Sequence, residues 1–390
     1  MSNMFEVINE YSQNAVIKVI GVGGGGGNAV ETMLKSKIHG AEFILANTDS
    51  QALRDVKGAT MIQIGSDITK GLGAGADPEK GRQAALEAKE EIASAIMGAD
   101  MLFIAAGMGG GTGTGAAPVI AQIARDAGIL TVAVVSKPFP FEGPKRMQYA
   151  NEGIEALNEW VDSLIVIPNE KLSEVYGNDN GLFESFTNAD DTLGSAVKGI
   201  AEIITIRGFI NVDFADVKTV MSGRGKAMMG LGLSAGENRA EEAVDKALNN
   251  PLLDNIELQN ASGVLVNITA GADLSSKEFD IIGRRVNEIA RDDATIIIGC
   301  IKEENNTGDL RVTLVATGFD TATTQSDTEE ISDTNEAKPS LQSIPGMPIT
   351  TTPTHSVDNS ANEQVTSEQI VAKENVDNID IPAFLRQQAD

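Results

Sequence analysis

The sequence predicts an α/β protein: a parallel sheet covered by helices, then a long connecting helix, a smaller α+β domain and a disordered tail. Between residues 15 and 168, short apolar runs alternate with amphipathic segments rich in alanine, as is typical of parallel strands buried on both faces. The chain has 40 glycines, and many of them gather in dense clusters directly after apolar runs. Between residues 320 and 374, large apolar side chains are almost absent.

Six apolar runs are the predicted strands of a first domain, which we place at residues 15–182 after an N-terminal extension of residues 1–14. Their ranges are 15–20, 42–47, 61–64, 101–106, 130–135 and 163–168. Helices are expected between them, over residues 28–38, 78–97 and 116–128. In folds of this kind ligands bind outside the carboxyl ends of the strands, where the glycine clusters lie.

A helix over residues 183–206 is predicted to connect the first domain to a smaller domain of residues 207–319. In the second domain, residues 262–269, 294–301 and 310–317 read as strands, and residues 276–292 have apolar side chains at helical spacing. Because these elements need no parallel crossover, we expect an α+β arrangement.

Residues 320–374 are rich in Thr, Ser, Asn, Asp, Glu and Pro, so they cannot bury enough apolar surface to offset their ordering entropy. We expect a disordered acidic linker of roughly 55 residues with a reach of about 40 Å. Residues 375–390 end the chain with an apolar cluster beside Arg386. An apolar cluster at the tip of a tether is typical of a short peptide that binds a partner.

Composition limits the classes of partner. A net charge of −26 and a pI of about 4.4 disfavour nucleic acid, because phosphate contacts need Lys and Arg, and disfavour adsorption on an anionic membrane. The N-terminus lacks the order of a signal peptide, and no apolar run approaches 18 residues. A single cysteine, Cys300, and two separate histidines, His39 and His355, argue against a disulfide and a zinc site. We expect a cytoplasmic protein with no nucleic-acid partner and no direct membrane insertion.

The first glycine cluster, residues 21–28, follows a predicted strand and opens a helix. Backbone amides and the helix dipole can face an anion there, although tight packing of strand on helix would also favour glycine. A second cluster, residues 107–115, follows the fourth strand and contains Thr112 and Thr114. Packing alone does not explain two such loops at the ends of two parallel strands. The sequence therefore predicts a site that binds phosphates.

The class of nucleotide stays open on these grounds. The sequence has no GxxxxGKS or GxxxxGKT motif, which excludes a P-loop enzyme, and neither glycine cluster contains a lysine. The phosphate charge would be met by amides, a cation and Arg146. A dinucleotide-binding domain is the rival hypothesis, since residues 21–26 fit its fingerprint and Asp49 lies where a ribose contact is expected. Such a domain does not require the second cluster.

A further polar group follows the long helix: Asn211, Asp213 and Asp216 lie within six residues. These side chains are able to hold a metal or orient a water, whereas the alternative is a helix N-cap with solvent-facing acids. A helix of about 20 residues would place them about 30 Å from the glycine clusters. One molecule cannot bring the two halves together, but two molecules stacked head to tail can.

Taken together, these motifs resemble those of the bacterial tubulin-like cell-division GTPases, the FtsZ family. They are GVGGGGGN, NTD, GLGAGA, GMGGGTGTG, KPFPFEGPKR and NVDFAD, and GGGTGTG is the tubulin-family signature. The resemblance extends from about residue 15 to residue 319 and resumes in the terminal DIPAFLRQQAD. It implies a tubulin-like, Rossmann-type GTPase domain that binds GTP or GDP together with Mg²⁺.

The resemblance also implies partners and a place in the cell. The chain would polymerise head to tail with itself, and the filaments would form the division ring. The terminal residues from Asp380 to Asp390 would bind membrane tethers of the FtsA and ZipA kind. The protein would then lie in the cytoplasm, at the division site on the inner face of the membrane.

Individual residues receive roles from the same resemblance. Phosphates would be bound by Gly24, Gly25, Gly26, Gly27, Asn28, Gly111, Thr112, Gly113 and Thr114. The γ-phosphate would be sensed by Gly75 and Ala76, the ribose contacted by Glu142 and Arg146, and the base reached by Asn169, Asp190 and Asp191. Asn211, Asp213 and Asp216 would be the catalytic residues of a synergy loop inserted into the neighbouring subunit, where the two acids position the attacking water.

Three residues depart from the family pattern. Asp77 follows GAGA where the family often has Asn, and the acid is expected to alter metal or phosphate contacts. Arg224 and Lys226 add positive charge before AMMG.

Three functions stay in view: a self-assembling GTPase, a nicotinamide-dependent oxidoreductase, and a filament protein that binds GTP without hydrolysing it. Asp213 and Asp216 favour the first, because a scaffold does not need them.

Overall fold

The computed structural model describes residues 15–319, apart from positions 37, 39, 55, 178–180, 207, 224, 254–259, 304–305 and 307. The described residues belong to one compact unit. Some features named above lie outside them: the N-terminal extension 1–14, the linker 320–374, the terminal peptide 375–390, and His39, Arg224 and His355.

Six parallel strands form the first part of the sheet, as the apolar runs predict. They are β1 (Ile17–Val22), β2 (Ala41–Asn47), β3 (Thr60–Gln63), β4 (Met101–Gly107), β5 (Leu130–Lys137) and β6 (Ser163–Pro168). Their order is β3-β2-β1-β4-β5-β6, and all neighbouring pairs are parallel. Dinucleotide-binding folds share this order, so topology alone does not distinguish the two nucleotide classes.

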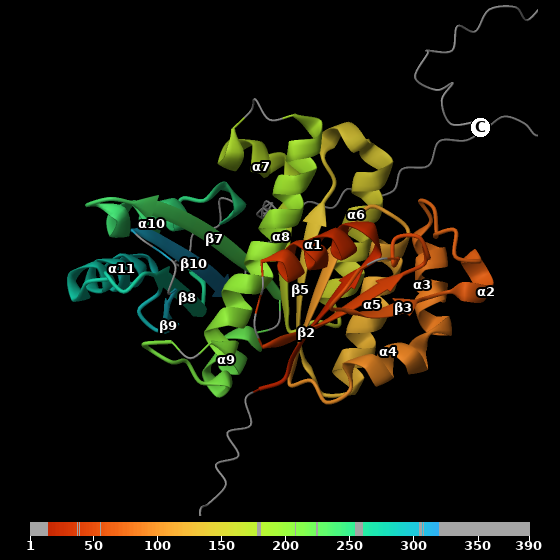
Figure 1. Ribbon diagram of the computed structural model, residues 1–390, viewed down its shortest axis with the longest axis horizontal. Coiled ribbons are helices and arrows are strands. Elements are labelled where there is room, and N and C mark those ends of the chain that lie inside the picture. The colour runs from red at the N-terminus through yellow and green to blue at the C-terminus, as the bar shows by residue number, and fades with distance from the viewer. Residues whose placement is uncertain are drawn as a thin grey trace, which may run out of the picture. The chain divides into compact units, whose positions relative to one another are not determined.

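Helices cover both faces of these strands (Figure 1). On one face lie α1 (Gly23–Lys35) and α8 (Leu182–Thr205), and on the other α3 (Pro78–Glu87), α4 (Lys89–Ile96), α5 (Thr112–Asp126) and α6 (Pro144–Asn158). Each face of these strands carries a hydrophobic core: the first core lies on the side of α1 and α8, and the second on the side of α3, α4, α5 and α6. In β4, Phe103 packs in the first core, while Leu102 and Ile104 pack in the second. Successive side chains of a strand point to opposite faces, and here both faces are buried, which is why β4 reads as an unbroken apolar run.

Three helices differ from the prediction. One of them is α5, which spans Thr112–Asp126 where a helix over residues 116–128 was expected. The first helix, α1, begins at Gly23, inside the glycine cluster and ahead of the expected Asn28. Glycine is a poor helix former, so the sequence pattern conceals this start. The helix expected over residues 78–97 is two helices, α3 and α4, which meet at Ala88. The short elements α2 (Ser66–Thr69) and η1 (Pro140–Glu142) precede α3 and α6.

The connecting helix α8 has 24 residues and follows the short helix α7 (Asn169–Tyr176). Its buried side enters the first core through Leu193, Val197 and Ile200. After α8 the chain passes through the segment that contains Asn211 and enters α9 (Phe214–Met221). The predicted synergy loop therefore lies at the end of α8 that is remote from the glycine clusters.

The second part of the chain extends the same sheet. Its elements are β7 (Gly225–Ala235), α10 (Arg239–Leu248), η2 (Pro251–Leu253), β8 (Gly263–Ala270), α11 (Ser276–Ile289), β9 (Thr295–Lys302) and β10 (Asp309–Thr317). The strand order continues as β7-β10-β8-β9, and the first three residues of β7 pair in parallel with the first three residues of β6. Strand β10 is antiparallel to both β7 and β8.

Two expectations for this part are corrected. The prediction that this part has no parallel crossover was wrong, since β8 and β9 are parallel and α11 connects them. Ile282 and Val286 of α11 are buried in a third hydrophobic core, which they share with side chains of α10, β8 and β10. Strand β7 was not predicted, because glycines interrupt its apolar pattern. A Cβ atom at Gly232 would lie 1.9 Å from the carbonyl oxygen of Ala243, so α10 packs directly on the backbone of this strand.

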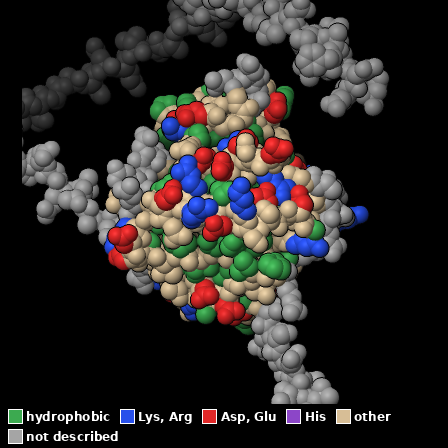
Figure 2. Space-filling model, turned by 90° about the vertical axis from the view of Figure 1, so that its left-hand side faces the viewer, with side chains coloured by type: hydrophobic (Ala, Val, Ile, Leu, Met, Phe, Trp, Pro, Cys, Tyr) green, Lys and Arg blue, Asp and Glu red, His purple; other side chains and the backbone are tan. Residues whose placement is uncertain are grey.

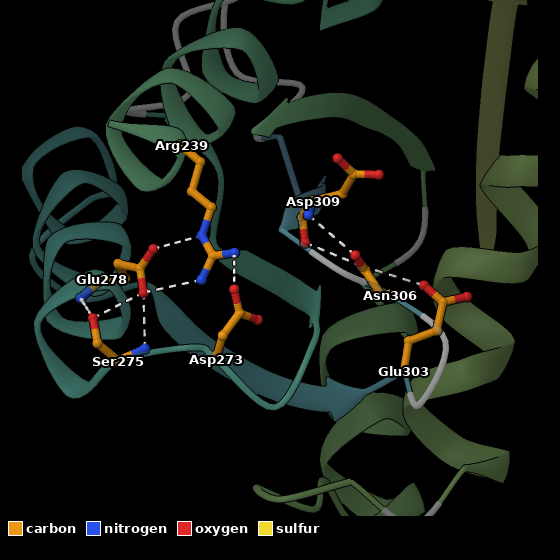
Figure 3. Close-up of polar contacts among 7 residues, drawn as sticks. All are labelled: Arg239, Asp273, Ser275, Glu278, Glu303, Asn306 and Asp309. Atoms are coloured by element: carbon orange, nitrogen blue, oxygen red, sulfur yellow. Dashed lines mark hydrogen bonds and ion pairs between the residues drawn. The ribbon is translucent and has the colours of Figure 1, made fainter. Parts of the chain in front are cut away.

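A buried ion-pair network joins the starts of α10 and α11 (Figure 3). Arg239 is only 5% exposed, and its guanidinium donates to Glu278 and Asp273 over 2.6 Å each. The Arg239 guanidinium lowers the pKa of Glu278 to about 2. Ser275 and Glu278 form a capping box at the start of α11. Figure 3 also shows the turn, held by Asn306, that leads into β10.

Charges of both signs are mixed on the side of the molecule that carries α10 and α11 (Figure 2). Arg285 pairs with Asp245 over 2.6 Å and with Glu288 over 3.3 Å. The described residues of this face therefore present no continuous positive field of the kind that nucleic acid requires. Among the described helices, none combines the length and the apolar character needed to cross a membrane.

Candidate functional site

The loops after the parallel strands surround a cleft of about 450 Å³. Its walls come from the loops that follow β1, β2, β4, β5 and β6, from residues 73–75, and from the first turns of α8. Both glycine clusters reach it, as expected for loops at the carboxyl ends of neighbouring parallel strands.

Two helices open onto this cleft with uncapped N-termini. Neither α1 nor α5 has a side chain that caps its first amides, and neither carries an acidic residue in its first turn. Gly24 and Gly111, at these two starts, line the cleft. Free N-terminal amides and the positive ends of two helix dipoles make this part of the cleft a binding site for anions.

The glycines divide between packing and ligand access. A Cβ atom at Gly26 would lie 2.2 Å from the carbonyl oxygen of Ala105, and one at Gly113 would lie 2.5 Å from that of Gly107. At Gly24 nothing lies within 4 Å. Packing therefore explains Gly26 and Gly113, whereas Gly24 leaves open space in which a ligand fits.

Threonine hydroxyls fix the loops around the cleft. Thr48 is fully buried, and its Oγ1 lies 2.7 Å from Oγ1 of Thr112. The carbonyl of Thr48 accepts hydrogen bonds from Thr69 Oγ1 and from the amide of Gly73, both at 3.2 Å. Thr48 thus connects residues 69–73 to the second glycine cluster, residues 107–115. Thr114 is buried and accepts a hydrogen bond from the amide of Gly109 at 2.8 Å.

The opposite end of the cleft offers hydrogen-bond acceptors and an aromatic ring. Asn169 is 5% exposed, and its Oδ1 has no hydrogen-bond partner within the described residues. A buried acceptor without a donor is a natural contact for a ligand N–H group. Burial raises the pKa of Asp190 to about 6, against a hydrogen bond with Asn28 that lowers it. Phe186 lines the same end.

Cationic side chains border the cleft between its two ends. Arg146 donates to Glu142 over 2.5 Å, and Glu142 in turn accepts from the amide of Phe139 at 2.9 Å. Lys137, the last residue of β5, also lines the cleft. A cleft bordered by Arg146 and Lys137 in a chain of strongly negative charge suits an anionic ligand.

The structure brings most of the expected binding residues to this one cleft. Those that line it are Gly24, Gly25, Asn28, Gly75, Gly111, Thr112, Gly113, Glu142, Arg146, Asn169 and Asp190. Those that are adjacent in sequence but do not line it are Gly26, Gly27, Ala76, Thr114 and Asp191.

Several lining residues were not among the predicted site residues, and three of them are Thr48, Lys137 and Phe186. Thr48 directly follows the predicted strand 42–47 and Lys137 lies two residues after the predicted strand 130–135, and these positions were a usable signal. Phe186 lies in an amphipathic helix, where an aromatic side chain cannot be told from a core residue.

Asp77 has a structural use that the sequence did not reveal. It is the N-cap residue of α3, where its Oδ1 accepts hydrogen bonds from the amides of Glu79 and Lys80 at 3.1 and 3.4 Å. It does not line the cleft. Asp77 thus caps α3, and its expected effect on metal or phosphate contacts stays a prediction.

The synergy-loop residues lie elsewhere. Asn211, Asp213 and Asp216 are exposed, and none has a hydrogen bond or ion pair from its side chain to another described residue. Asp213 occupies the N-cap position of α9, yet its carboxylate makes no capping hydrogen bond. In the described part of the chain, no group of three or more His, Cys, Asp or Glu side chains is arranged to hold a metal ion.

Comparison with known families defines the class. Residues 16–177 match the GTPase domain of the Tubulin/FtsZ family, and residues 225–320 match the C-terminal domain of the FtsZ family. The fold and the cleft are therefore those of a tubulin-like GTPase, and the dinucleotide-binding hypothesis is wrong.

Individual relatives identify the family within this class. The chain is 51% identical to the cell division protein FtsZ of Pseudomonas aeruginosa over 395 residues, covering 99% of this chain and 100% of that one. It is 56% identical to the Coxiella burnetii protein of the same name over 316 residues, covering 81% and 82% of the two chains. The chain belongs to the FtsZ family of cell-division proteins.

Solved structures agree with this assignment. An FtsZ dimer from M. jannaschii is 47% identical with a TM-score of 0.75, covering 78% of this chain and 88% of that one. A GTPγS-bound protofilament of CetZ2 from Haloferax volcanii, only 20% identical, shares the fold with a TM-score of 0.66 over 78% and 93% of the two chains.

Proposed function

We propose that this GTPase hydrolyses GTP at sites shared between subunits stacked head to tail, using acids that each subunit inserts into its neighbour. The observation that carries the proposal is the separation of the two halves. The cleft contacts the start of α8, whereas Asn211, Asp213 and Asp216 follow its end. A helix of 24 residues is about 36 Å long, so a subunit cannot place its own acids at its own cleft.

The phosphates of GTP or GDP bind at the helix starts in this proposal. Amides from Gly24 to Asn28 and from Gly111 to Thr114 hold them, and Gly75 with Ala76 senses the γ-phosphate. The uncapped N-termini of α1 and α5 support this placement.

The base and ribose occupy the other end of the cleft. Glu142 and Arg146 contact the ribose, and Asn169, Asp190 and Asp191 reach the base. Guanine presents N–H groups on its Watson–Crick edge, and the free Oδ1 of Asn169 and the carboxylate of Asp190 are acceptors. A site built from acceptors rejects a base that lacks those donors, because its own groups would then stay unpaired.

Magnesium is the cation we propose to accompany the nucleotide. Mg²⁺ prefers oxygen ligands and is usually held by phosphates and water with one or two protein groups. Asp49 and the hydroxyl of Thr112 line the cleft and offer such oxygens. When bound, the ion would supply positive charge that neutralises the phosphates.

Hydrolysis depends on the neighbour's acids. Asp213 and Asp216 accept hydrogen bonds from the attacking water and aim its lone pair at the γ-phosphate, while Asn211 orients them. Their exposure and the absence of a capping bond to Asp213 support this role, since neither carboxylate has a side-chain partner among the described residues. Loss of the γ-phosphate weakens the contact between subunits, which makes the filament dynamic.

The experiment for this proposal replaces Asp216 by alanine. We expect Asp216→Ala to bind GTP as tightly as the wild type and to lose about 10²-fold or more in turnover, as for loss of a general acid–base group. Fluorescent GTP binding and phosphate release are measured in parallel. Asp126→Ala, which removes an exposed carboxylate from the end of α5, is the matched control. Wild-type turnover in Asp216→Ala would remove this acid from the mechanism.

The division ring and its attachment complete the proposal. The filament lies in the cytoplasm at the division site, and residues 380–390, outside the described part of the chain, bind tethers of the FtsA and ZipA kind. Deleting residues 380–390 is expected to spare polymerisation and to abolish binding to purified tethers, measured by light scattering and by co-sedimentation. Collapse of polymerisation in the truncated protein would show that this division of labour is mistaken.

A further inference from the structure

The segment that precedes α9 is fixed to the free edge of β9, the last strand in the sheet order. The amides of Phe209 and Ile210 donate to the carbonyl oxygen of Cys300 at 2.8 and 3.4 Å, and the amide of Cys300 donates to the carbonyl oxygen of Ile210 at 3.2 Å. Ile210 and Cys300 thus form an isolated antiparallel bridge. Figure 1 shows α9 and β9 near each other at this end of α8.

Glycine is required where this segment approaches the strand. A Cβ atom at Gly208 would lie 2.3 Å from the carbonyl oxygen of Cys300, the atom that accepts both hydrogen bonds. The backbone there is not in the left-handed region, so close approach, and not conformational freedom, explains the glycine. Any side chain at this position has to lift the segment off β9.

The bridge also sets which side chains face outward. Beyond Ile210, the exposed residues Asn211 and Asp213 alternate with Val212 and Phe214, which pack against the first core. Val212 lies close to Gly299 on β9, where an added Cβ would meet its Cγ2 at 3.3 Å. In an extended segment a slip of one residue exchanges the two faces. Asn211 and Asp213 would then point inward and the apolar pair outward.

We infer that the Ile210–Cys300 bridge is a register pin that presents Asn211 and Asp213 to the neighbouring subunit, with Gly208 as a positioning residue. This inference rests on the catalytic role proposed above for the synergy loop. The pin acts on hydrolysis between subunits and leaves the nucleotide cleft of its own subunit intact, because that cleft lies at the other end of α8.

The direct test compares Phe209→Pro with Phe209→Ala. Both remove an aromatic ring that is 88% exposed, but only proline also removes the amide that donates to Cys300. We expect equal GTP binding in the two variants. Turnover per polymerised subunit should be about 10²-fold lower in Phe209→Pro, the scale of loss that a displacement of about 1 Å produces at a reacting group. Equal turnover in the two variants would overturn the inference.

A mixing experiment separates positioning from misfolding. Gly208→Ala keeps an intact cleft, and Gly25→Val is expected to block phosphate binding while keeping an intact synergy loop. In mixed filaments the first variant supplies GTP and the second supplies correctly presented acids, so the mixture should exceed the summed turnover of the two alone. Gly283→Ala in α11, where the added methyl group meets only ordinary contacts, is the control for the substitution itself. Absence of rescue would overturn the role of Gly208.

Asp213→Asn, assayed beside these variants, distinguishes the two proposals. Wild-type turnover in Asp213→Asn would count against the catalytic role of that acid. Slow turnover in Asp213→Asn, together with equal turnover in the two Phe209 variants, would leave that role standing and reject the pin alone.

Discussion

At the scale of single residues, Asp190 is a point where the site responds to pH. Burial raises the pKa of Asp190 to about 6, while a hydrogen bond with Asn28 lowers it and the charges of Asp191 and Glu31 raise it. Because the folded pKa lies above the ordinary value, this group stabilises the free protein at low pH, and that contribution is lost as pH rises through about 6. Nucleotide binding should oppose this shift if guanine N–H groups face the ionised carboxylate.

We therefore expect GTP affinity to rise between pH 5 and pH 7, by up to about tenfold per pH unit below the pKa. Calorimetry in buffers of different ionisation enthalpy should detect proton release on binding near pH 6. Asp190→Asn keeps an acceptor oxygen but cannot titrate, so its affinity should vary little over this range. The same pH dependence in Asp190→Asn would show that another group is responsible.

Residue roles were predictable from the sequence only in part. Gly24 and Gly26 look identical in the glycine cluster, but Gly26 faces a carbonyl oxygen of β4 while Gly24 faces open space. This difference depends on how α1 lies against β4, which no local pattern encodes. Phe186 was missed for the same reason, since its exposure to the cleft follows from where the start of α8 lies.

At the scale of elements, the contact between α3 and α5 connects packing to the site. A Cβ atom at Gly115 would lie 1.9 Å from the carbonyl oxygen of Pro78, and one at Gly81 would lie 2.2 Å from that of Gly111. The start of α5, which lines the cleft, is therefore in direct backbone contact with α3.

Gly115→Ala is expected to push α3 away from α5, which lowers the free energy of unfolding by about 1–3 kcal/mol and weakens GTP binding. Urea unfolding and nucleotide titration measure the two effects. Gly283→Ala, the same change on an open helix surface, should leave both nearly unchanged. Unaltered GTP affinity in a destabilised Gly115→Ala would mean that this contact supports the fold without shaping the site.

Elements were predicted well where burial imposes a pattern. The six parallel strands are buried on both faces and therefore read as apolar runs. Strand β7 and the start of α1 were missed because glycine, required there for close backbone contact, has a low propensity for both strand and helix. The parallel pairing of β8 and β9 requires α11 to return the chain to the end of the sheet where β8 begins, which the periodicity of α11 does not specify.

At the scale of the whole molecule, the length of α8 separates the nucleotide cleft from the proposed catalytic acids. The apolar spacing predicts this helix, and its length separates Asp213 and Asp216 from the two glycine clusters of the same chain. The structure adds that Asp213 and Asp216 are exposed and unpaired within the described residues. In the proposed mechanism, a complete hydrolytic site therefore requires a second subunit.

The most direct test of this claim is GTP turnover per molecule as protein concentration is raised, with light scattering recorded on the same samples. A site shared between subunits predicts turnover near zero below a threshold concentration, followed by a rise that coincides with the rise in scattering. Turnover per molecule that stays constant from dilute solution upward would mean that each subunit holds a complete site, and it would contradict the shared-site mechanism.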